Sequence, residues 1–307
     1  MSDTQLDDYS FLDRTEEESK GRTGQSDPKD GHLHGFVYNM PYEEYAKVDA
    51  LNASKSVHMR RSPMYYRYAL THPSPETTAT ILGTLVHRLI LEPEVENAIS
   101  VWGREKWMKV RNGGEWEKWR ESQGENQIVT VKEYEAVMQM SVCALTHAPV
   151  SRYATAEGPT EVCMFWRHEV TGRRMKARLD KLIPSTHTIP DLKTTRDSRP
   201  WRFGPQAYSL GYVLKMAHYW SGYKTLKGIE PKVKLLALES KPPHESVVYN
   251  VSRDMLLLGL EECEKLIEKI DECEAQKRWP ALEQDEVELQ MPPWASPEED
   301  TELGLEL

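Results

Sequence analysis

Several signals that would place this chain of 307 residues in a familiar class are absent. Its four cysteines, Cys143, Cys163, Cys263 and Cys273, form no Cys-x-x-Cys pair and no tight group, so the sequence predicts neither a zinc knuckle nor an iron–sulfur cluster. No apolar run is long enough to cross a membrane, and the first residues lack the basic and apolar regions of a secretion signal. We expect reduced, structural thiols in a soluble, cytoplasmic protein that has no membrane partner.

Three hydrolase signatures are missing as well. The chain contains no Gly-x-Ser-x-Gly elbow, no Walker phosphate loop and no His-Glu-x-x-His helix. These absences argue against the hydrolases that depend on a serine elbow, a nucleotide-binding loop or that zinc helix. An enzymatic function must therefore rest on other residues.

Acidic charge is concentrated at the two ends of the chain. Of 49 acidic and 39 basic side chains, residues 1–34 hold 9 and 4, and residues 281–307 hold 9 and none, which leaves 31 and 35 for residues 35–280. The net charge of −10 thus hides a slightly basic centre. Because both ends are also poor in apolar periodicity, we predict acidic disordered tails at 1–34 and 281–307 around one folded domain at 35–280.

Three short apolar or alternating runs predict adjacent strands, at residues 162–166, 174–180 and 187–193. Thr171-Gly172 and Pro184-Ser185 separate them, so the pattern favours a β-meander. Side chains alternate along a strand, which puts Asp191 and Lys193 on one face while Leu192 turns into the core. Asp180 can join them from the neighbouring strand.

Two carboxylates beside an ammonium group suit the hydrolysis of a phosphodiester. A carboxylate cluster binds a hard cation such as Mg²⁺, which takes its remaining ligands from water and substrate phosphate. The cation lowers the pKa of a bound water, and a second ion can stabilise both the attacking and the leaving oxygen. Lys193 is placed to orient the water and to offset charge on phosphorus.

The motifs around these residues resemble the PD-(D/E)XK nuclease superfamily. Pro190-Asp191-Leu192-Lys193 with an upstream acid is similar to its central motif. Gly83-Thr-Leu-Val-His87 on a predicted helix, Asp191-Leu-Lys-Thr-Thr195, and the segment from Gly211 to Tyr219 resemble elements of the RecB-like branch. With Asn52-Ala-Ser-Lys-Ser and Arg61-Ser-Pro-Met-Tyr-Tyr, residues 38–280 most resemble the exodeoxyribonuclease VIII (RecE-type) catalytic domains.

The resemblance implies a restriction-endonuclease-like α/β core, a central mixed sheet flanked by helices, with an α-helical N-terminal region. It implies a metal site of His87, Asp180, Asp191 and Leu192. It implies catalytic roles for Lys193, Asp191, Asp180, Glu161, Tyr219 and Lys215. The family's glutamine falls on Lys215 here, and an ammonium group can hold a phosphate but cannot accept a hydrogen bond.

The same resemblance implies a 5′-to-3′ exonuclease that acts on linear double-stranded DNA and leaves 3′ single strands for recombination. Its cofactor would be Mg²⁺, with Mn²⁺ as a substitute, at one or two ions per site. Such relatives are phage or prophage proteins of bacterial cells, form homo-oligomeric rings and work with a single-strand annealing protein. Two alternatives stay open: a nuclease fold that binds DNA without cleaving it, and a RecB-like endonuclease.

Basic and aromatic residues outside the core motifs are candidates for DNA contact. We assign this role to Arg61, Arg178, Arg196, Arg199, Arg202 and Tyr212. An insertion at about 101–127 interleaves four tryptophans with six basic residues over residues 101–120, which suits either stacking on bases or packing on the core. The acidic tails either solubilise the protein or compete with DNA for the basic centre.

Apolar periodicity predicts the remaining elements of the core. Helices are expected at about 52–70, 77–91, 203–226 and 252–278, and strands at 233–239 and 246–251. Asn52 is the expected cap of the first helix.

Overall fold

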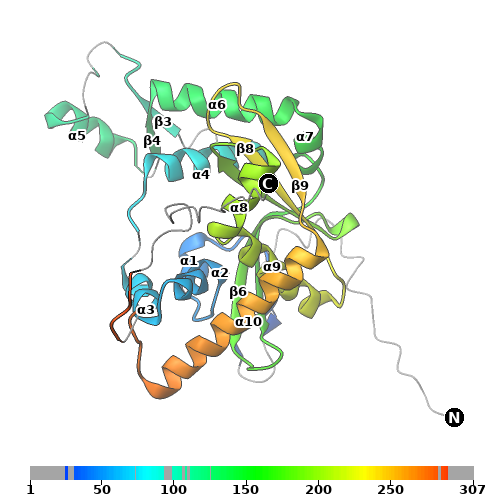
Figure 1. Cartoon of the computed structure of the whole chain (residues 1–307). Coiled ribbons are helices and arrows are strands. Elements are labelled where there is room, and N and C mark those ends of the chain that lie inside the picture. Colours follow the sequence, from blue (N-terminus) through cyan, green and yellow to red (C-terminus); the bar gives the residue numbers. More distant parts are fainter. Residues whose placement is uncertain are drawn as a thin grey trace, which may run out of the picture.

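The structure is a computed structural model that describes residues 25–26, 31–72, 74–92, 99–105, 108, 111–124, 126–282 and 285–289. Helices lie on both faces of a sheet, which gives a mixed α/β fold (Figure 1). The predicted α/β class is confirmed. Within the described ranges, no helix is both long and apolar enough to span a membrane.

An antiparallel sheet contains the first two strands of the predicted meander. Its order is β1-β2-β5-β6, with β1 Gln25–Ser26, β2 Leu33–Val37, β5 Thr160–Arg167 and β6 Arg174–Lys181. The β5–β6 hairpin agrees with the predicted strands at 162–166 and 174–180. β2 begins at Leu33, inside the segment 1–34 that we predicted as a tail, and the domain bounds stay a prediction.

The third predicted strand belongs to a second sheet, of order β7-β8-β9. Its strands are β7 Thr188–Thr195, β8 Lys232–Glu239 and β9 Ser246–Asn250. β7 pairs in parallel with β8 and puts Asp191 opposite Leu235. The meander prediction is therefore wrong at this strand. The 3-10 turn η5 Pro184–Thr186 and the left-handed His187, with φ of 48°, redirect the chain between β6 and β7.

The second sheet separates two hydrophobic cores. Along β8, Leu235 and Ala237 belong to the core shared with β5, β6 and two C-terminal helices, whereas Leu236 and Leu238 belong to a core on the other face. Side chains alternate along a strand, so a continuous apolar run is what a strand buried on both faces requires. Leu192 lies in the second core, as predicted.

The N-terminal region is helical, as predicted. It contains α1 Tyr42–Lys47, α2 Ala53–Ser56, the 3-10 turn η3 Val57–Arg60, α3 Pro63–Thr71 and α4 Thr78–Leu91. Asn52 caps α2, because its side chain accepts a hydrogen bond of 2.9 Å from the backbone of Lys55. The helix predicted over 52–70 is interrupted, since Ser62 caps α3 and Pro63 occupies its first turn.

The helix predicted over 203–226 consists of two helices, α8 Pro200–Ser209 and α9 Tyr212–Lys227. Gly211 between them has φ of 75°, a conformation that glycine adopts without strain. A Cβ atom there would lie 2.7 Å from Val57 Cγ2. The break thus depends on contact with a distant segment, which helical periodicity does not reveal.

The C-terminal helix α10 Arg253–Gln276 is capped by Ser252 and packs against α9, close to the bounds we predicted. Figure 1 shows α9 and α10 on one side of the β7-β8-β9 sheet, and α4 and α6 (Val131–Thr146) on the other. The sheet edge that carries Asp191 and Lys193 therefore lies between helices that can bring further side chains to it.

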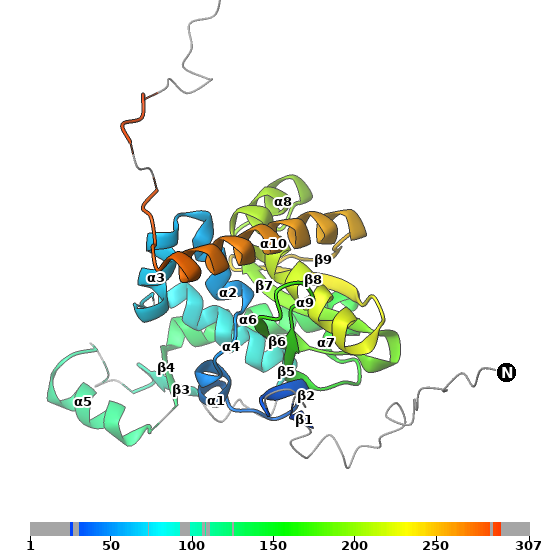
Figure 2. The same cartoon turned by 90° about the horizontal axis from the view of Figure 1, so that it is seen from below.

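The insertion predicted at about 101–127 runs from within β3 Ile99–Trp102, through α5 Gly113–Ser122, to the start of β4 Gln127–Thr130. The helices α6 Val131–Thr146 and α7 Ala148–Ala154 follow. β3 and β4 are parallel, and α5 projects from the main body in both views (Figures 1 and 2). Trp102, Trp116 and Trp119 pack on one another with ring centroids 5.0–5.8 Å apart. These three pack on one another and belong to neither of the two large core clusters, so base stacking by this insertion stays a prediction. Trp107 lies outside the described residues.

Candidate metal centre and active site

His87 reaches the site because α4 approaches β7 closely. Gly83 lies one turn before His87 on the same side of the helix. A Cβ atom on Gly83 would lie 3.2 Å from Thr194 Oγ1, tighter than an ordinary contact. Gly83, the first residue of the Gly-x-x-x-His motif, therefore allows α4 to pack close to β7. This close packing brings His87, the last residue of the motif, into the site.

Asp180 joins the two sheets through its side chain. It lies near the end of β6, and its Oδ2 accepts a hydrogen bond of 3.0 Å from the backbone N–H of Leu192 on β7. Burial alone would raise the pKa of this carboxyl, but the charges of Lys193 and His87 outweigh burial and hold the pKa well below its usual range. Asp180 is therefore an anion at neutral pH, available to a cation in the site.

Glu161 enters the site from β5 with an unusual backbone conformation. Its φ is 53°, which is costly for a residue with a side chain, by roughly 1–3 kcal/mol. Its Oε2 forms an ion pair of 2.8 Å with Arg178 Nε. Burial raises the pKa of the Glu161 carboxyl, and Arg178 and His87 only partly offset that effect. The conformation directs this side chain toward His87.

The imidazole of His87 lies between two carboxylates. Its Nε2 is 3.1 Å from Asp180 Oδ2, and its Nδ1 is 3.6 Å from Glu161 Oε1. Burial would lower the pKa of His87, but the charges of Asp180 and Glu161 outweigh it and raise the pKa. Nε2 is buried and makes no well-aligned hydrogen bond. The ring is therefore not committed to a protein hydrogen bond, and this donor set fits a divalent cation.

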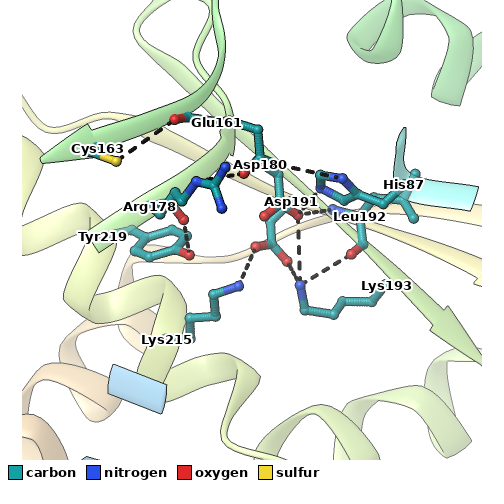
Figure 3. Close-up of polar contacts among 10 residues, drawn as sticks. All are labelled: His87, Glu161, Cys163, Arg178, Asp180, Asp191, Leu192, Lys193, Lys215 and Tyr219. Atoms are coloured by element: carbon teal, nitrogen blue, oxygen red, sulfur yellow. Dashed lines mark hydrogen bonds and ion pairs between the residues drawn. The ribbon is translucent and has the colours of Figure 1, made fainter. Parts of the chain in front are cut away.

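Asp191 is fully buried and is held by two ammonium groups. Lys193 Nζ donates to Asp191 Oδ2, and Lys215 Nζ donates to Asp191 Oδ1 at 3.2 Å (Figure 3). Lys193 Nζ also donates to the carbonyl oxygen of Leu192 at 3.1 Å and lies 3.9 Å from Asp180 Oδ2. The predicted shared face of Asp191 and Lys193 is thus present, and Lys193 links the two aspartates.

The helix α9 adds Lys215 and Tyr219, one turn apart. Tyr219 donates from its hydroxyl to the carbonyl oxygen of Arg178, and Lys215 Nζ lies 5.2 Å from the centre of the Tyr219 ring. Burial would lower the pKa of Lys215, yet Asp191, Tyr219 and Asp180 together outweigh burial and raise the pKa well above its usual value. Lys215 therefore remains charged and acts as the counter-ion of Asp191.

Most of these side chains line a pocket of about 870 Å³, while Asp191 and Tyr219 are not part of its wall. Its wall contains His87, Glu161, Asp180, Lys193 and Lys215, together with the following residues: Ala79, Thr80, Gly83, Thr84, Arg88, Glu92, Arg178, Leu192, Thr194 and Tyr212. The pocket therefore brings together side chains from α4, β5, β6, β7 and α9 that are up to 136 positions apart in the sequence, as the separation of Ala79 from Lys215 shows.

Comparison with known proteins agrees with this geometry. A family model described as a PDDEXK-like domain of unknown function (DUF3799) matches residues 53–288. The chain belongs to this family. The predicted PD-(D/E)XK superfamily is thereby confirmed, and the family supports a nuclease. No curated protein matches the chain.

Two solved structures resemble this PDDEXK-like chain. A "Putative exonuclease" from Eubacterium rectale has a TM-score of 0.58 at 14% identity, and the match covers 82% of this chain and 95% of that one. At this identity the likeness shows the fold alone. The protein SSO0001 matches with a TM-score of 0.27 at 14% identity, covering 69% of this chain and 85% of that one, and such a score carries no argument.

Of the residues that we assigned to DNA contact, two line the pocket of this PDDEXK-like domain, Arg178 and Tyr212. The other four, Arg61, Arg196, Arg199 and Arg202, are not part of its wall. Arg61 stacks on Tyr65, with its guanidinium carbon 4.3 Å from the ring centre. Arg199 is paired with Asp197 at 2.5 Å, so its charge is partly neutralised. Their contact with DNA stays a prediction.

Sequence reasoning missed Glu92. A nitrogen of His87 and carboxylate oxygens of Glu92 and Glu161 lie within 4.8 Å of one another, and among the described residues this is the His, Cys, Asp and Glu group close enough to share an ion. Asp191, predicted to belong to such a group, instead faces Lys193 and Lys215. Glu92 ends α4 five residues after His87, but no motif marks it.

Proposed function

We propose that this PDDEXK-like protein is a divalent-metal-dependent nuclease that hydrolyses DNA phosphodiesters. The observation that supports it best is the convergence of His87, Asp180 and Lys193 on one open pocket. The three come from a helix and from strands of two different sheets, and packing alone does not require that arrangement. Imidazole, carboxylate and ammonium groups around one cleft are the residue types that metal-assisted phosphoryl hydrolysis uses.

Each residue has a proposed role. His87, Asp180, Asp191 and the carbonyl group of Leu192 would hold Mg²⁺, or Mn²⁺ in its place, at one or two ions per site. When bound, the cation would supply Lewis-acid activation of water and phosphate. Lys193 orients the attacking water and offsets the charge that develops on the phosphate oxygens.

The remaining site residues support this arrangement. Lys215 keeps Asp191 ionised and in place, and Tyr219 fixes the backbone of β6 at Arg178. Glu161 is held by Arg178 beside His87. Arg178 and Tyr212 line the pocket, where a guanidinium can contact phosphate and a ring can stack on a base.

We further propose an exonuclease that acts at linear duplex ends, degrades 5′ to 3′ and leaves 3′ single strands for recombination with an annealing protein. The support is the likeness of its motifs to the RecE-type enzymes and the fold it shares with the "Putative exonuclease" from Eubacterium rectale. A homo-oligomeric ring would let a modestly basic core hold DNA, since several subunits pool their phosphate contacts.

One observation favours a second candidate, a nuclease fold that binds DNA without cleaving it. Asp191 is buried and neutralised by two lysines, which would satisfy the carboxylate without a metal ion. End-labelled linear DNA and closed circular DNA, each incubated with Mg²⁺, separate the candidates. An exonuclease degrades only the linear DNA, an endonuclease also cuts the circle, and a passive binder shifts both without cutting.

Asp191→Ala and Lys193→Ala are each expected to reduce the cleavage rate by at least about 100-fold, because one removes a ligand and the other the charge beside the phosphate. EDTA should abolish cleavage in the wild type. Circular dichroism checks that the variants fold. Cleavage that survives EDTA or either substitution would contradict the proposal.

A further inference from the structure

A second cation position lies beside the one that the motifs mark. His87, Glu92 and Glu161 each offer a ligand atom, and these atoms lie within 4.8 Å of one another. His87 Nδ1 is 3.6 Å from Glu161 Oε1, which is too long for a good hydrogen bond. Two ligands of one Mg²⁺ or Mn²⁺ ion, each about 2.1 Å from it, are roughly 3 to 4 Å apart. The 3.6 Å between His87 Nδ1 and Glu161 Oε1 falls in this range.

Glu92 has no ion-pair partner in the part of the chain that the structure describes. Arg178 engages Glu161 through Oε2, which leaves Oε1 facing His87. The side chain of Glu92 is half-buried and lines the pocket, and Arg88 in the same wall forms no ion pair with it. A bound cation would neutralise this carboxylate.

Asp191 belongs to a different part of the site. Its two oxygens are taken by Lys193 and Lys215, so it does not contribute to the cluster around Glu92. A neutral imidazole has one lone pair, so His87 can coordinate through Nδ1 or through Nε2 but not through both. With Nδ1 used, Nε2 carries the proton and lies 3.1 Å from Asp180 Oδ2, and a neighbouring carboxylate is the usual companion of a ligating histidine.

We propose that His87, Glu92 and Glu161 bind a divalent cation, with Glu92 as a ligand that no sequence motif marks. The proposal deepens the nuclease assignment and rests on it for its biological meaning. Carboxylate oxygens suit Mg²⁺ and Mn²⁺, and the imidazole favours Mn²⁺ over Mg²⁺. Asp180, Asp191 and the Leu192 carbonyl group remain for the second ion of a two-ion site.

The test measures cation binding without DNA and without turnover. Mn²⁺ is titrated into the full chain and free Mn²⁺ is followed by electron paramagnetic resonance, for the wild type, Glu92→Gln and Glu76→Gln. Glu76 is a matched control, because it is an exposed glutamate on the segment that leads into the same helix and is not in the pocket wall. A thermal melt with and without Mn²⁺ gives a second readout, since a ligand stabilises the fold that binds it.

Glu92→Gln is expected to weaken one Mn²⁺ site by at least about tenfold and to reduce the Mn²⁺-induced rise in Tm, while its metal-free Tm stays that of the wild type. Glu76→Gln should bind as the wild type does. Glu92→Asp keeps the charge, so its Mn²⁺ affinity should lie between those of Glu92→Gln and the wild type. It also controls for a folding defect in Glu92→Gln. Unchanged Mn²⁺ binding in Glu92→Gln, or no Mn²⁺ binding by the wild type, overturns the proposal.

The same titration separates this proposal from the nuclease assignment. Lys193→Ala should lose DNA cleavage yet keep the Glu92-dependent Mn²⁺ site, because Lys193 is not part of the cluster. A wild type that binds Mn²⁺ through Glu92 but cuts no DNA would refute the nuclease and leave the cation site standing. If the protein cleaves DNA but its Mn²⁺ binding does not depend on Glu92, the cation site is refuted and the nuclease assignment stands.

Discussion

Lys215 gives Asp191 a second ammonium partner, at the position where the RecB-like nucleases have a glutamine. A fully buried carboxylate is stable only when its charge is paired and its oxygens accept hydrogen bonds. Lys193 satisfies one oxygen and Lys215 the other. The substitution therefore replaces a neutral hydrogen-bond donor with a charge, and it ties α9 to β7 through the site itself.

His218 provides a pH test of the folded core. Its ring packs on Trp166 and lies 3.0 Å from the carbonyl oxygen of Lys176, and burial lowers its pKa to about 4. The unfolded chain binds a proton at about pH 6.5, so between pH 6.5 and 4 the unfolded state holds more protons than the folded one. Above pH 6.5 His218 does not lower the free energy of unfolding, because it is neutral in both states. As the pH falls toward 4, protonation of the unfolded state lowers the free energy of unfolding by about 3 kcal/mol.

Urea unfolding at pH 7 and at pH 4.5 measures this effect, with His218→Gln as the comparison. The variant keeps an N–H donor for Lys176 but cannot titrate, so its free energy of unfolding should fall less between the two pH values than that of the wild type. His87, whose pKa is raised, works in the opposite direction in both proteins and cancels in the comparison. Equal pH dependence of the two proteins would refute a neutral buried His218.

At the scale of elements, the distance between α4 and β7 decides where His87 lies. Gly83→Ala adds a methyl group 3.2 Å from Thr194 Oγ1, so the helix must move by a few tenths of an ångström. Alanine also improves helix propensity by up to about 1 kcal/mol, which offsets much of the strain. We expect an unchanged Tm but a cleavage rate reduced by about tenfold or more, because the imidazole is displaced from its partners.

Thr194, which the new methyl group would contact, supplies the control for the Gly83→Ala prediction. Thr194→Ala removes the hydroxyl that the new methyl group would meet, so Gly83→Ala should reduce the rate less in a Thr194→Ala background than in the wild type. Cleavage rates and Tm values of the four proteins form a double-mutant cycle. Additive effects on the rate would mean that the close approach at Gly83 does not position His87.

The elements that the sequence predicted well are those whose own side chains report burial. The strands β5, β6, β7 and β8 carry continuous or alternating apolar runs, and α4 carries an apolar stripe at helical spacing. The break at Gly211 and the pairing of β7 were not predicted, because each depends on contacts with segments far away in the chain, Val57 in one case and β8 in the other.

At the scale of the whole molecule, we predict that the acidic C-terminal segment competes with DNA for the basic centre of the chain. Residues 281–307 hold 9 acidic and no basic side chains, while residues 35–280 are slightly basic. Removing residues 281–307 is expected to raise DNA affinity several-fold at low salt and little at high salt, because acidic competition is electrostatic and is screened. Fluorescence anisotropy with labelled duplex DNA at 50 and 300 mM salt measures the change.

A full-length chain with the nine acids changed to amides separates charge from length. It should behave as the truncated chain does if the charge competes with DNA. A truncation that leaves the salt titration unchanged would discard the competition and keep the solubilising role. Pro280 stays in the truncated chain, where its carbonyl oxygen accepts the backbone hydrogen bond from Met64.

The sequence by itself determined the α/β class, the nuclease superfamily and the residue types of the site, because hydrophobic periodicity and short motifs are local properties of the chain. The tertiary structure decided which charges meet. It paired Asp191 with Lys193 and Lys215, and it brought Glu92 to Glu161 and His87 across the ends of α4 and β5. Coulomb interactions depend on distance in space, and sequence separation does not report that distance until the sheets and helices have packed.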